Sequence, residues 1–390
     1  LFVSACAPDF TEAWETSEPR LLGARVEAAD GSPRPKLGDP FSLRFGIALP
    51  SGNWPTPLAS RYGFDVSLCL GFLSDNGVLT CLGEQQFTPT VTPLSDSEVL
   101  VSGLALDLSG LGALGLTPSQ LVSGAALTEI DRLALFGVFC VDGDPERVPN
   151  TVAGDDPPSA LYRCLPRAGA SFTDATTFSL SVFFDRGIAS EANRDPAFAC
   201  DPAAPTSACS AGTVIAGEPQ VPGTFVIAKP KPKKGTGLRE VVAWPARDPA
   251  SPLPWDNCAA DPSLVQIRGD SGEHSLRARF DPSDREDYSY VLQVNGRPET
   301  RTGREALTLT HQVTLQAGKL NRFDSKLDSG DPDSEAEISF RWTPPEKGND
   351  LESIPDSGRL VRFSFTLRDE RGGIDFTTRE VCLLPALRGG

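Results

Sequence analysis

Near its end the chain reads Leu360-Val-Arg-Phe-Ser-Phe-Thr-Leu-Arg-Asp-Glu-Arg-Gly-Gly-Ile-Asp-Phe-Thr-Thr-Arg-Glu-Val-Cys382. Apolar side chains take every second position of its first half: Val361, Phe363, Phe365 and Leu367. The middle, residues 369–373, is rich in turn-forming residues. The pattern therefore predicts a strand over 359–368, a turn, and a strand over 374–384, with one face in a core and the other in water.

The same period of two recurs along the chain. It is found in segments 276–280, 307–313 and 336–342, and earlier in 41–49, 64–70 and 178–184. Segments 21–27, 98–107 and 131–142 add candidate strands, which gives about seven strands over 20–186, as in a β-sandwich. One short helix is predicted after Thr117, the N-cap, and Pro118, its first residue. The sequence thus predicts an all-β protein of two antiparallel β-sandwich domains.

Length and composition agree with this organisation. The chain has 390 residues, 39% of them hydrophobic, which at ~150 residues per domain suggests two or three domains with real cores. We expect a first sandwich over 21–186, a linker containing Pro and Cys over 187–222, and a second, Ig-like sandwich over 223–390. A single continuous β domain is the main structural alternative.

The net charge and the apolar runs limit the partners. Lys plus Arg number 36 and Asp plus Glu 52, so the net charge is −16. A chain this acidic is repelled by phosphate backbones, which argues against nucleic acid as a partner. No run of 18 apolar residues occurs in the sequence, so no helix is predicted to span a membrane.

The opening Leu1-Phe-Val-Ser-Ala-Cys6 is similar to the bacterial lipobox, in which an aliphatic and two small residues precede a Cys. In this interpretation residues 1–5 are a signal-peptide remnant, Cys6 carries diacylglycerol, and residues 6–20 form a tether. Acyl chains contribute roughly 0.8 kcal/mol per buried methylene, enough to hold a multiply acylated protein on a membrane. The alternative is an ordinary Cys in a trimmed secreted chain. The predicted location is extracytoplasmic, at the outer membrane or cell surface.

Eight Cys remain after Cys6, and an even number in an exported protein predicts disulfides. Eight Cys allow 105 connectivities. Sequential pairing is the simplest, because each pair then stays inside one segment: Cys69–Cys81, Cys140–Cys164, Cys200–Cys209 and Cys258–Cys382. No CxxC pair occurs, and the spacings fit no zinc pattern. No metal ligation by these Cys is predicted.

The hairpin over 360–382 resembles the closing hairpin of Ig-like domains in surface lipoproteins of myxobacteria and their relatives. Asn193-Arg-Asp-Pro196 and Ala306-Leu-Thr-Leu-Thr-His311 are similar to segments of the same proteins. The resemblance covers roughly the C-terminal half, and its motifs are mostly structural. It implies an architecture and a location, and no activity.

Few residues offer catalytic chemistry. The only two His, His274 and His311, fall in phase with apolar neighbours of their strands, which indicates core positions. A shared site would require those strands to be neighbours. Gly110-Leu-Gly-Ala-Leu-Gly115 matches the dinucleotide GxGxxG string, but no βαβ unit surrounds it, so we interpret it as a loop. Lys229-Pro-Lys-Pro-Lys-Lys234 is either a basic docking strip or a solvated linker or hairpin tip. No cofactor is predicted.

Two acidic clusters are possible hard-cation sites. Asp142 and Asp144 lie in the first, ahead of Asp155 and Asp156. The second contains weak calcium candidates, namely Asp328, Asp331 and Asp333. It fits no EF-hand spacing, and a solvated acidic loop is the alternative.

The absence of a nucleophile motif, a cofactor loop and metal spacing predicts a protein that is not an enzyme. We expect a membrane-anchored surface lipoprotein that acts as a structural, adhesion or assembly module. Its partner would be a protein or a surface polysaccharide. The alternative is an extracytoplasmic carbohydrate-active hydrolase that uses paired carboxylates.

Overall fold

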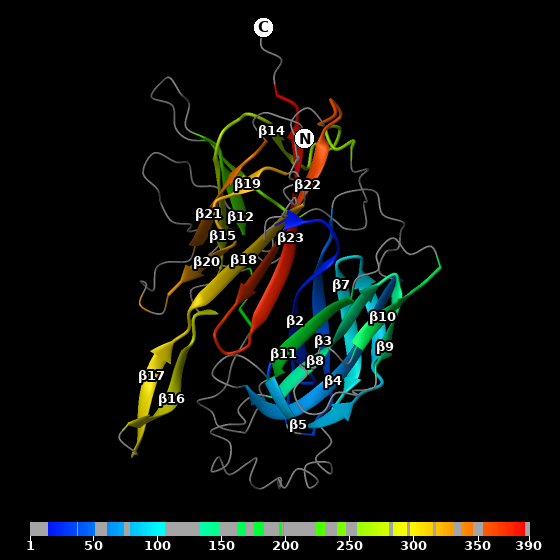
Figure 1. Cartoon of the computed structure of the whole chain (residues 1–390). Coiled ribbons are helices and arrows are strands. Elements are labelled where there is room, and N and C mark those ends of the chain that lie inside the picture. Colours follow the sequence, from blue (N-terminus) through cyan, green and yellow to red (C-terminus); the bar gives the residue numbers. More distant parts are fainter. Residues whose placement is uncertain are drawn as a thin grey trace, which may run out of the picture.

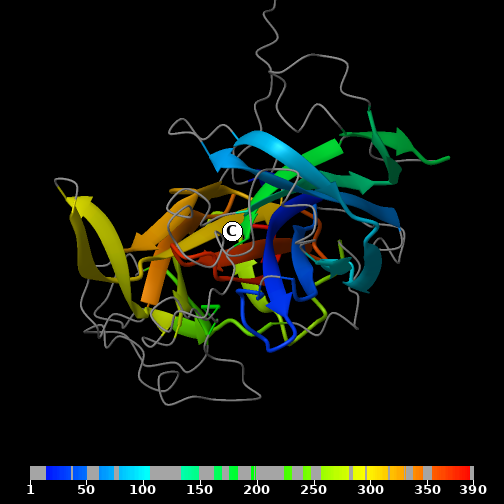
Figure 2. The same ribbon diagram turned by 90° about the horizontal axis from the view of Figure 1, so that it is seen from below.

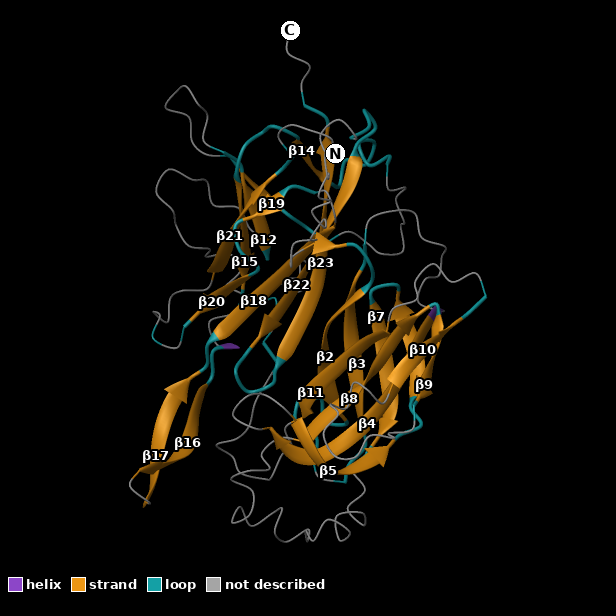
Figure 3. Ribbon diagram, viewed as in Figure 1, coloured by secondary structure: helices purple, strands orange, loops and turns teal. Residues whose placement is uncertain are grey.

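In the residues that it describes, the computed structural model contains β-strands, their connections and 3₁₀ turns at Arg61 and Asp284, with no α-helix (Figures 1 and 3). The described residues are 15–36, 38–50, 61–73, 79–105, 133–148, 162–168, 175–182, 195–196, 198, 224–230, 240–246, 256–280, 284–294, 297–314, 317–328, 330, 337–345 and 354–386. The predicted all-β sandwich class is confirmed. The helix predicted after Thr117 lies outside the described residues.

The first sandwich consists of two four-stranded antiparallel sheets. One sheet contains, in spatial order, β2 (Arg20–Ala28), β3 (Phe41–Ala48), β7 (Glu98–Leu104) and β6 (Thr90–Ser95). The other contains β11 (Ala175–Val182), β8 (Leu133–Val141), β4 (Tyr62–Leu73) and β5 (Leu79–Gln86). The ring of Phe64 lies between those of Phe45 and Phe139, with centroids 4.8 and 5.0 Å away. These buried rings join the two sheets into one core.

The second sandwich also has two sheets. One contains β1 (Glu15–Thr16), β18 (Leu307–Thr314), β22 (Arg359–Arg368), β23 (Ile374–Leu384) and β14 (Val265–Arg268), and β20 (Asp324–Leu327) also pairs with β18. The other contains β13 (Val241–Ala243), β12 (Phe225–Ala228), β15 (His274–Arg279), β21 (Glu337–Thr343) and β19 (Lys319–Leu320). Trp244 and Trp342 are buried between the sheets, and each indole N–H donates to a backbone carbonyl at 2.9 Å.

The hairpin that decided the fold class has the predicted bounds. β22 pairs with β23 from Arg359–Leu383 to Arg368–Ile374 without a register shift. In the turn, the Asp369 carboxylate accepts the backbone N–H groups of Arg371 and Gly373 at 2.7 and 2.8 Å. The turn therefore satisfies its own backbone groups, as Asp does in such loops.

Two smaller ribbons stand beside the sandwiches. β9 (Gly143–Arg147) and β10 (Tyr162–Pro166) form one next to the first sandwich. β16 (Asp287–Val294) and β17 (Arg297–Arg304) form the other, which we call the arm. The arm projects from the second sandwich and stands apart from both sandwiches in two perpendicular views (Figures 1 and 2).

The chain begins its described path in the second sandwich. β1 pairs in parallel with the end of β18, and Thr16 is buried there. The expectation of a tether over 6–20 is therefore wrong for Glu15 and Thr16, and for Arg20, with which β2 begins, while residues 6–14 lie outside the described residues. A two-residue strand shows no periodicity in a sequence, and β1 is held by residues about 300 positions away.

Two disulfides join described residues. Cys140 of β8 is bonded to Cys164 of β10, and Cys258 is bonded to Cys382 of β23. These are two of the four sequential pairs that the sequence predicted. The pairs Cys69–Cys81 and Cys200–Cys209 concern side chains outside the described residues. The second described bond ties the segment before β14 to the closing strand of the same sheet.

Candidate functional site: the domain junction and the arm

The two sandwiches contact each other where β2 and β3 meet the hairpin of β22 and β23. A Cβ on Gly46 would lie 2.7 Å from the ring of Phe376, so only glycine allows this approach. On β22, the Arg368 guanidinium donates to the Leu22 carbonyl of β2 at 2.5 Å. The junction is thus packed and hydrogen-bonded.

Part of the predicted linker is bound at this junction. The Ile374 N–H donates to the Asp195 carboxylate at 3.0 Å, and the Phe198 N–H donates to the Asp375 carboxylate at 3.1 Å. The Phe198 ring lies 5.3 Å from that of Phe225 and packs on the second core. We call residues 195, 196 and 198 the strap. The remainder of the predicted linker, 187–222, lies outside the described residues.

Two carboxylates where the strap meets β23, those of Asp195 and Asp375, have raised pKa values. Burial raises the pKa of Asp195 to about 6, against the lowering effect of the Ile374 N–H and of Arg25. The charges of Asp369 and Asp375 raise it further. Burial also raises the pKa of Asp375, although Arg25 approaches it to 3.7 Å. This corner of the junction therefore holds two acids whose charged forms are disfavoured by burial.

We predict that Asp195 makes the junction more stable in mild acid. A folded-state pKa of about 6, above the ordinary value of 3.8, means that the folded protein binds more protons over this range. The stabilisation is complete below about pH 4 and is lost as the pH rises through 6. Asp195→Asn should reduce the fall in unfolding free energy between pH 4 and 7 by roughly 1–3 kcal/mol. Urea unfolding at a series of pH values measures it, and an unchanged pH profile would contradict the prediction.

A second cluster of charged residues holds the base of the arm. Glu305, which is fully buried, follows β17, and its carboxylate lies 3.0 Å from the Arg371 guanidinium of the β22–β23 turn. The other carboxylate oxygen accepts the Glu286 N–H at 3.1 Å. Arg285, also buried, donates to the carbonyls of Glu305 and Asp328 at 3.4 and 2.5 Å. We call residues 285, 286, 305 and 371 the clamp.

The clamp carries an acid with a shifted pKa. Burial raises the pKa of Glu305 to about 7, and the nearby charge of Asp369 adds to this, while Arg371 opposes it. The Arg371 guanidinium also lies 5.1 Å from the ring centroid of Tyr288 on β16. Each strand of the arm is thus connected to the turn of the closing hairpin, so the arm has a fixed base.

The two His do not form a shared site. His274 is on β15 and His311 on β18, which belong to opposite sheets. His274 is hydrogen-bonded to the Ser271 hydroxyl at 2.8 Å, and His311 donates to the Arg322 carbonyl at 2.5 Å. Burial lowers the pKa of His311 to about 4, so it is neutral at physiological pH. Both rings are buried, as the core interpretation predicted.

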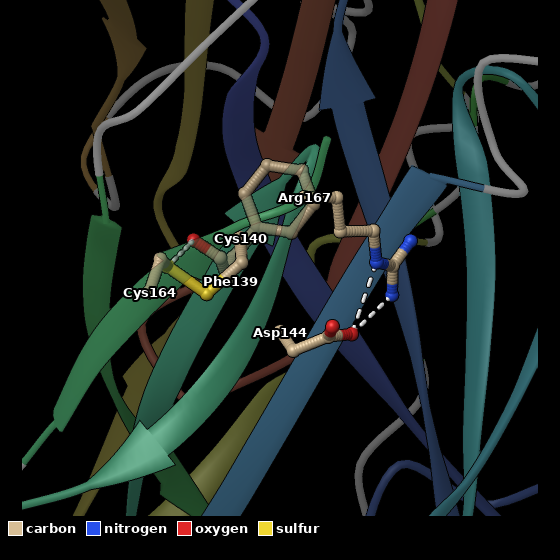
Figure 4. The surroundings of a disulfide bond; sticks show 5 residues. All are labelled: Phe139, Cys140, Asp144, Cys164 and Arg167. Carbon is tan, nitrogen blue, oxygen red and sulfur yellow. Dashed lines mark hydrogen bonds and ion pairs between the residues drawn. A yellow bond between two sulfur atoms is a disulfide. The ribbon is translucent and has the colours of Figure 1, made fainter. Parts of the chain in front are cut away.

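The described residues of the acidic clusters form ion pairs with Arg and Lys side chains of the same chain. Asp142 pairs with Arg61, and Asp144 accepts two hydrogen bonds from Arg167 beside the Cys140–Cys164 bond (Figure 4). Asp328 is exposed and lies 3.3 Å from the Lys326 ammonium. Within the described ranges no three His, Cys, Asp or Glu side chains are grouped as metal ligands.

Several predicted residues lie outside the described ranges: Cys6, Gly110–Gly115, Asp155, Asp156, Asp331 and Asp333. Of the basic strip, Lys229 and Pro230 are described. Lys229 pairs with Glu240 at 2.7 Å, at the end of the antiparallel hairpin of β12 and β13. The remainder of the strip, residues 231–234, lies outside the described residues, so both of its interpretations stay predictions.

Sequence reasoning missed the strap and the clamp. Glu305 did carry a signal, because it has the same parity as the core residues Leu307 and Leu309. A Glu in phase with a core face indicates a buried charge that needs a partner. Asp195 lies in a segment that was quoted only for its resemblance, and no local pattern marks its role.

The proposed function is argued from the geometry described above. In the part of the chain that the structure describes, no helix has the length and hydropathy needed to cross a bilayer. No protein-family model matches the chain, and no curated protein is significantly similar to it.

Proposed function

We propose that this protein is a non-catalytic, membrane-anchored surface lipoprotein that acts as a structural, adhesion or assembly module. The observation that carries the proposal is the arm, a two-stranded ribbon that projects from the second sandwich. An isolated two-stranded hairpin is marginally stable in water. The clamp buries charged groups at its base, as expected for an element that presents a surface to a partner.

The position of the arm fits an anchor on Cys6. The arm leads into the start of β18, whereas β1 pairs with Val313 and Thr314 at the end of β18. The eight residues of β18 separate the two sites by roughly 24 Å. A lipid on Cys6, nine positions before Glu15, would be joined to the described fold through β1. The arm would then project from the opposite end of β18.

The proposed location is extracytoplasmic, at the outer membrane or cell surface, and the proposed kinship is with Ig-like surface lipoproteins of myxobacteria. The supporting observations are the Val-Ser-Ala-Cys6 string, the two disulfides and the sandwich architecture. The partner is a protein or a surface polysaccharide, and the net charge of −16 argues against nucleic acid.

The arm is tested by partner capture from intact native cells, combined with a glycan array. The full chain is compared with a variant in which residues 291–300 are replaced by an Asn-Gly turn that closes on the hydrogen-bonded pair 290 and 301, which retains the base of the ribbon and the clamp. We expect the full chain to capture a protein or polysaccharide without turnover, and the short-arm variant to lose it. Equal capture by both proteins would contradict the proposed role of the arm.

The anchor makes a separate prediction. Mass spectrometry of the mature N-terminus from native membranes should show diacylglycerol on Cys6, and Cys6→Ser should move the protein to the soluble fraction. A myristoyl-sized chain alone gives reversible binding, so multiple acylation is expected. An unmodified Cys6 thiol on membrane-bound protein would rule out this anchor.

The second candidate function is a carbohydrate-active hydrolase, and the observation in its favour is the pair Asp195 and Asp375 with raised pKa values. Both carboxylates, however, accept backbone N–H groups that hold the strap. Polysaccharide turnover that is lost in both Asp195→Asn and Asp375→Asn, with folding retained, would establish the hydrolase instead.

A further inference from the structure

Among the described residues, no strand pairs with the outer edge of β17, and we call this the open edge of the arm. β17 pairs with β16 on one side, and no other described strand pairs with it. The Glu305 N–H donates to the Glu286 carbonyl at 3.0 Å, in register with the ribbon. In an antiparallel ladder, hydrogen-bonded pairs alternate with non-hydrogen-bonded pairs, whose backbone groups point away from the partner strand. The backbone groups of Thr300 and Thr302 therefore point away from β16, as does the carbonyl of Pro298.

This edge is exposed and carries alternating charges. Glu299, Thr300, Arg301 and Thr302 are consecutive exposed residues. Exposed edges usually carry charges that repel a second strand. Here the two charges have opposite sign and flank Thr300 symmetrically, so an antiparallel copy of the same strand meets attraction instead.

We propose that the open edge of β17 pairs antiparallel with the same edge of a second copy of this chain, with Thr300 opposite Thr300. Each Thr300 N–H then donates to the Thr300 carbonyl of the other copy, and each Thr302 N–H donates to the Pro298 carbonyl. Pro298 has no N–H, so the ladder ends there. The contact is self-complementary, as a twofold dimer requires.

The charges select this register. With Thr300 opposite Thr300, Glu299 of each copy faces Arg301 of the other in a non-hydrogen-bonded pair, where side chains are closest. Shifting one strand by two residues places either Arg301 opposite Arg301 or Glu299 opposite Glu299. Like charges directly opposite are destabilising. Within one chain an Arg301 guanidinium nitrogen lies 3.4 Å from a Glu299 carboxylate oxygen, so pairing replaces the two intrachain ion pairs of the two copies by two equivalent pairs between them.

The inference rests on the proposed function in one respect, because it names a second copy as a partner of the arm. Five residues from each chain make a small interface, which alone gives weak association. Anchoring on one membrane would raise the effective concentration of the two copies.

Cysteine crosslinking tests the register in the full chain carrying Cys6→Ser. Directly opposite, hydrogen-bonded residues have Cα atoms about 5.5 Å apart, within disulfide range. Thr300→Cys should therefore form covalent dimers under mild oxidation. The matched control is Thr302→Cys, whose counterpart lies four residues, about 13 Å, farther along the strand. Equal rates for the two variants, or rates no faster than the parent chain, would overturn the proposal.

Charge reversal tests the selection of the register. In the Thr300→Cys background, Glu299→Arg or Arg301→Glu should each slow crosslinking by roughly tenfold. The double exchange Glu299→Arg with Arg301→Glu should restore the rate. Circular dichroism checks that each variant folds. We expect each to fold, because the substituted positions are exposed. A double exchange as slow as the single variants would count against the proposal.

The two tests fail separately. If the short-arm variant loses its native partner but Thr300→Cys does not crosslink, the arm is a binding element and the dimer is refuted. If Thr300→Cys crosslinks but shortening the arm leaves partner capture unchanged, the dimer stands and the wider role of the arm in capture is refuted.

Discussion

Replacing both Cys258 and Cys382 by alanine is expected to lower the free energy of unfolding of the second sandwich by about 2–5 kcal/mol. The bond closes a segment of 124 residues, and long closed segments lose the most chain entropy when crosslinked. Both Cys are fully buried, so their removal also leaves space among Leu264, Leu360 and Leu384.

The matched comparison is the same change at Cys140 and Cys164, which are separated by only 24 residues. The chain-entropy estimate for that pair is smaller by roughly 1–2 kcal/mol, and its effect should be confined to the first sandwich. Guanidinium unfolding followed by tryptophan fluorescence measures the second sandwich, because Trp244 and Trp342 are buried in its core. An unchanged midpoint for that transition would contradict the prediction.

The backbone next to the Cys258–Cys382 bond has no spare room. Gly358 has a φ of +81°, which favours glycine, and a Cβ there would lie 2.9 Å from the sulfur of Cys258. Gly31 has a similar φ of +79° with open space around it. Gly358→Ala should therefore destabilise more than Gly31→Ala, and the difference reports the packing against the disulfide.

The closing hairpin could be predicted from the sequence because its determinants are local. Apolar residues recur at every second position of β22, and a turn rich in Asp and Gly lies between the two strands. Such a pattern needs no knowledge of the remainder of the chain. The same reason explains why the strand bounds 359–368 and 374–384 agree with the structure.

The junction could not be predicted because its determinants are distant. The bonds between the strap and β23 join residues 177 and 179 positions apart, and the Arg368–Leu22 bond joins residues 346 positions apart. A single residue such as Asp195 belongs to no periodic pattern in the sequence. A parallel two-residue strand such as β1 is likewise defined only by its partner.

The clamp could be predicted in part from the sequence. The parity of Glu305 with Leu307 indicates that its carboxylate is buried, and this follows from the sequence. The partner, Arg371, lies in the turn of the closing hairpin, 66 residues away. Local reasoning interpreted that turn only as a connection between strands, so the arm and its base were not expected.

Replacing Arg371 by methionine should show what the clamp contributes. Methionine keeps much of the apolar stem but removes the charge that lies 3.0 Å from Glu305 and 4.0 Å from Glu286. At pH 8 Glu305 is ionised in the parent protein, because its pKa is about 7. Breaking a buried ion pair from one side costs about 3–5 kcal/mol, so we expect a loss near the lower end of this range.

At pH 5 the same substitution should cost much less. Glu305 is then protonated in the folded state, since the pH is below its raised pKa. Its unfolded-state pKa lies near the ordinary value of 4.5, so the raised folded pKa favours folding in acid and this gain is lost as the pH rises through 7. The remaining cost is the lost hydrogen bond and the contact with Tyr288, roughly 1–2 kcal/mol.

Two controls separate charge from packing. Arg341 forms an exposed pair with Glu273, and Arg341→Met should change stability by less than about 0.5 kcal/mol at either pH. Adding Glu305→Gln to Arg371→Met removes the buried charge and should reduce the loss at pH 8 to about the loss expected at pH 5. Urea unfolding of the four proteins at pH 5 and 8 measures these differences. Equal losses for Arg371→Met at both pH values would mean that Arg371 stabilises the base of the arm by packing alone, and that the clamp is not an ionic one.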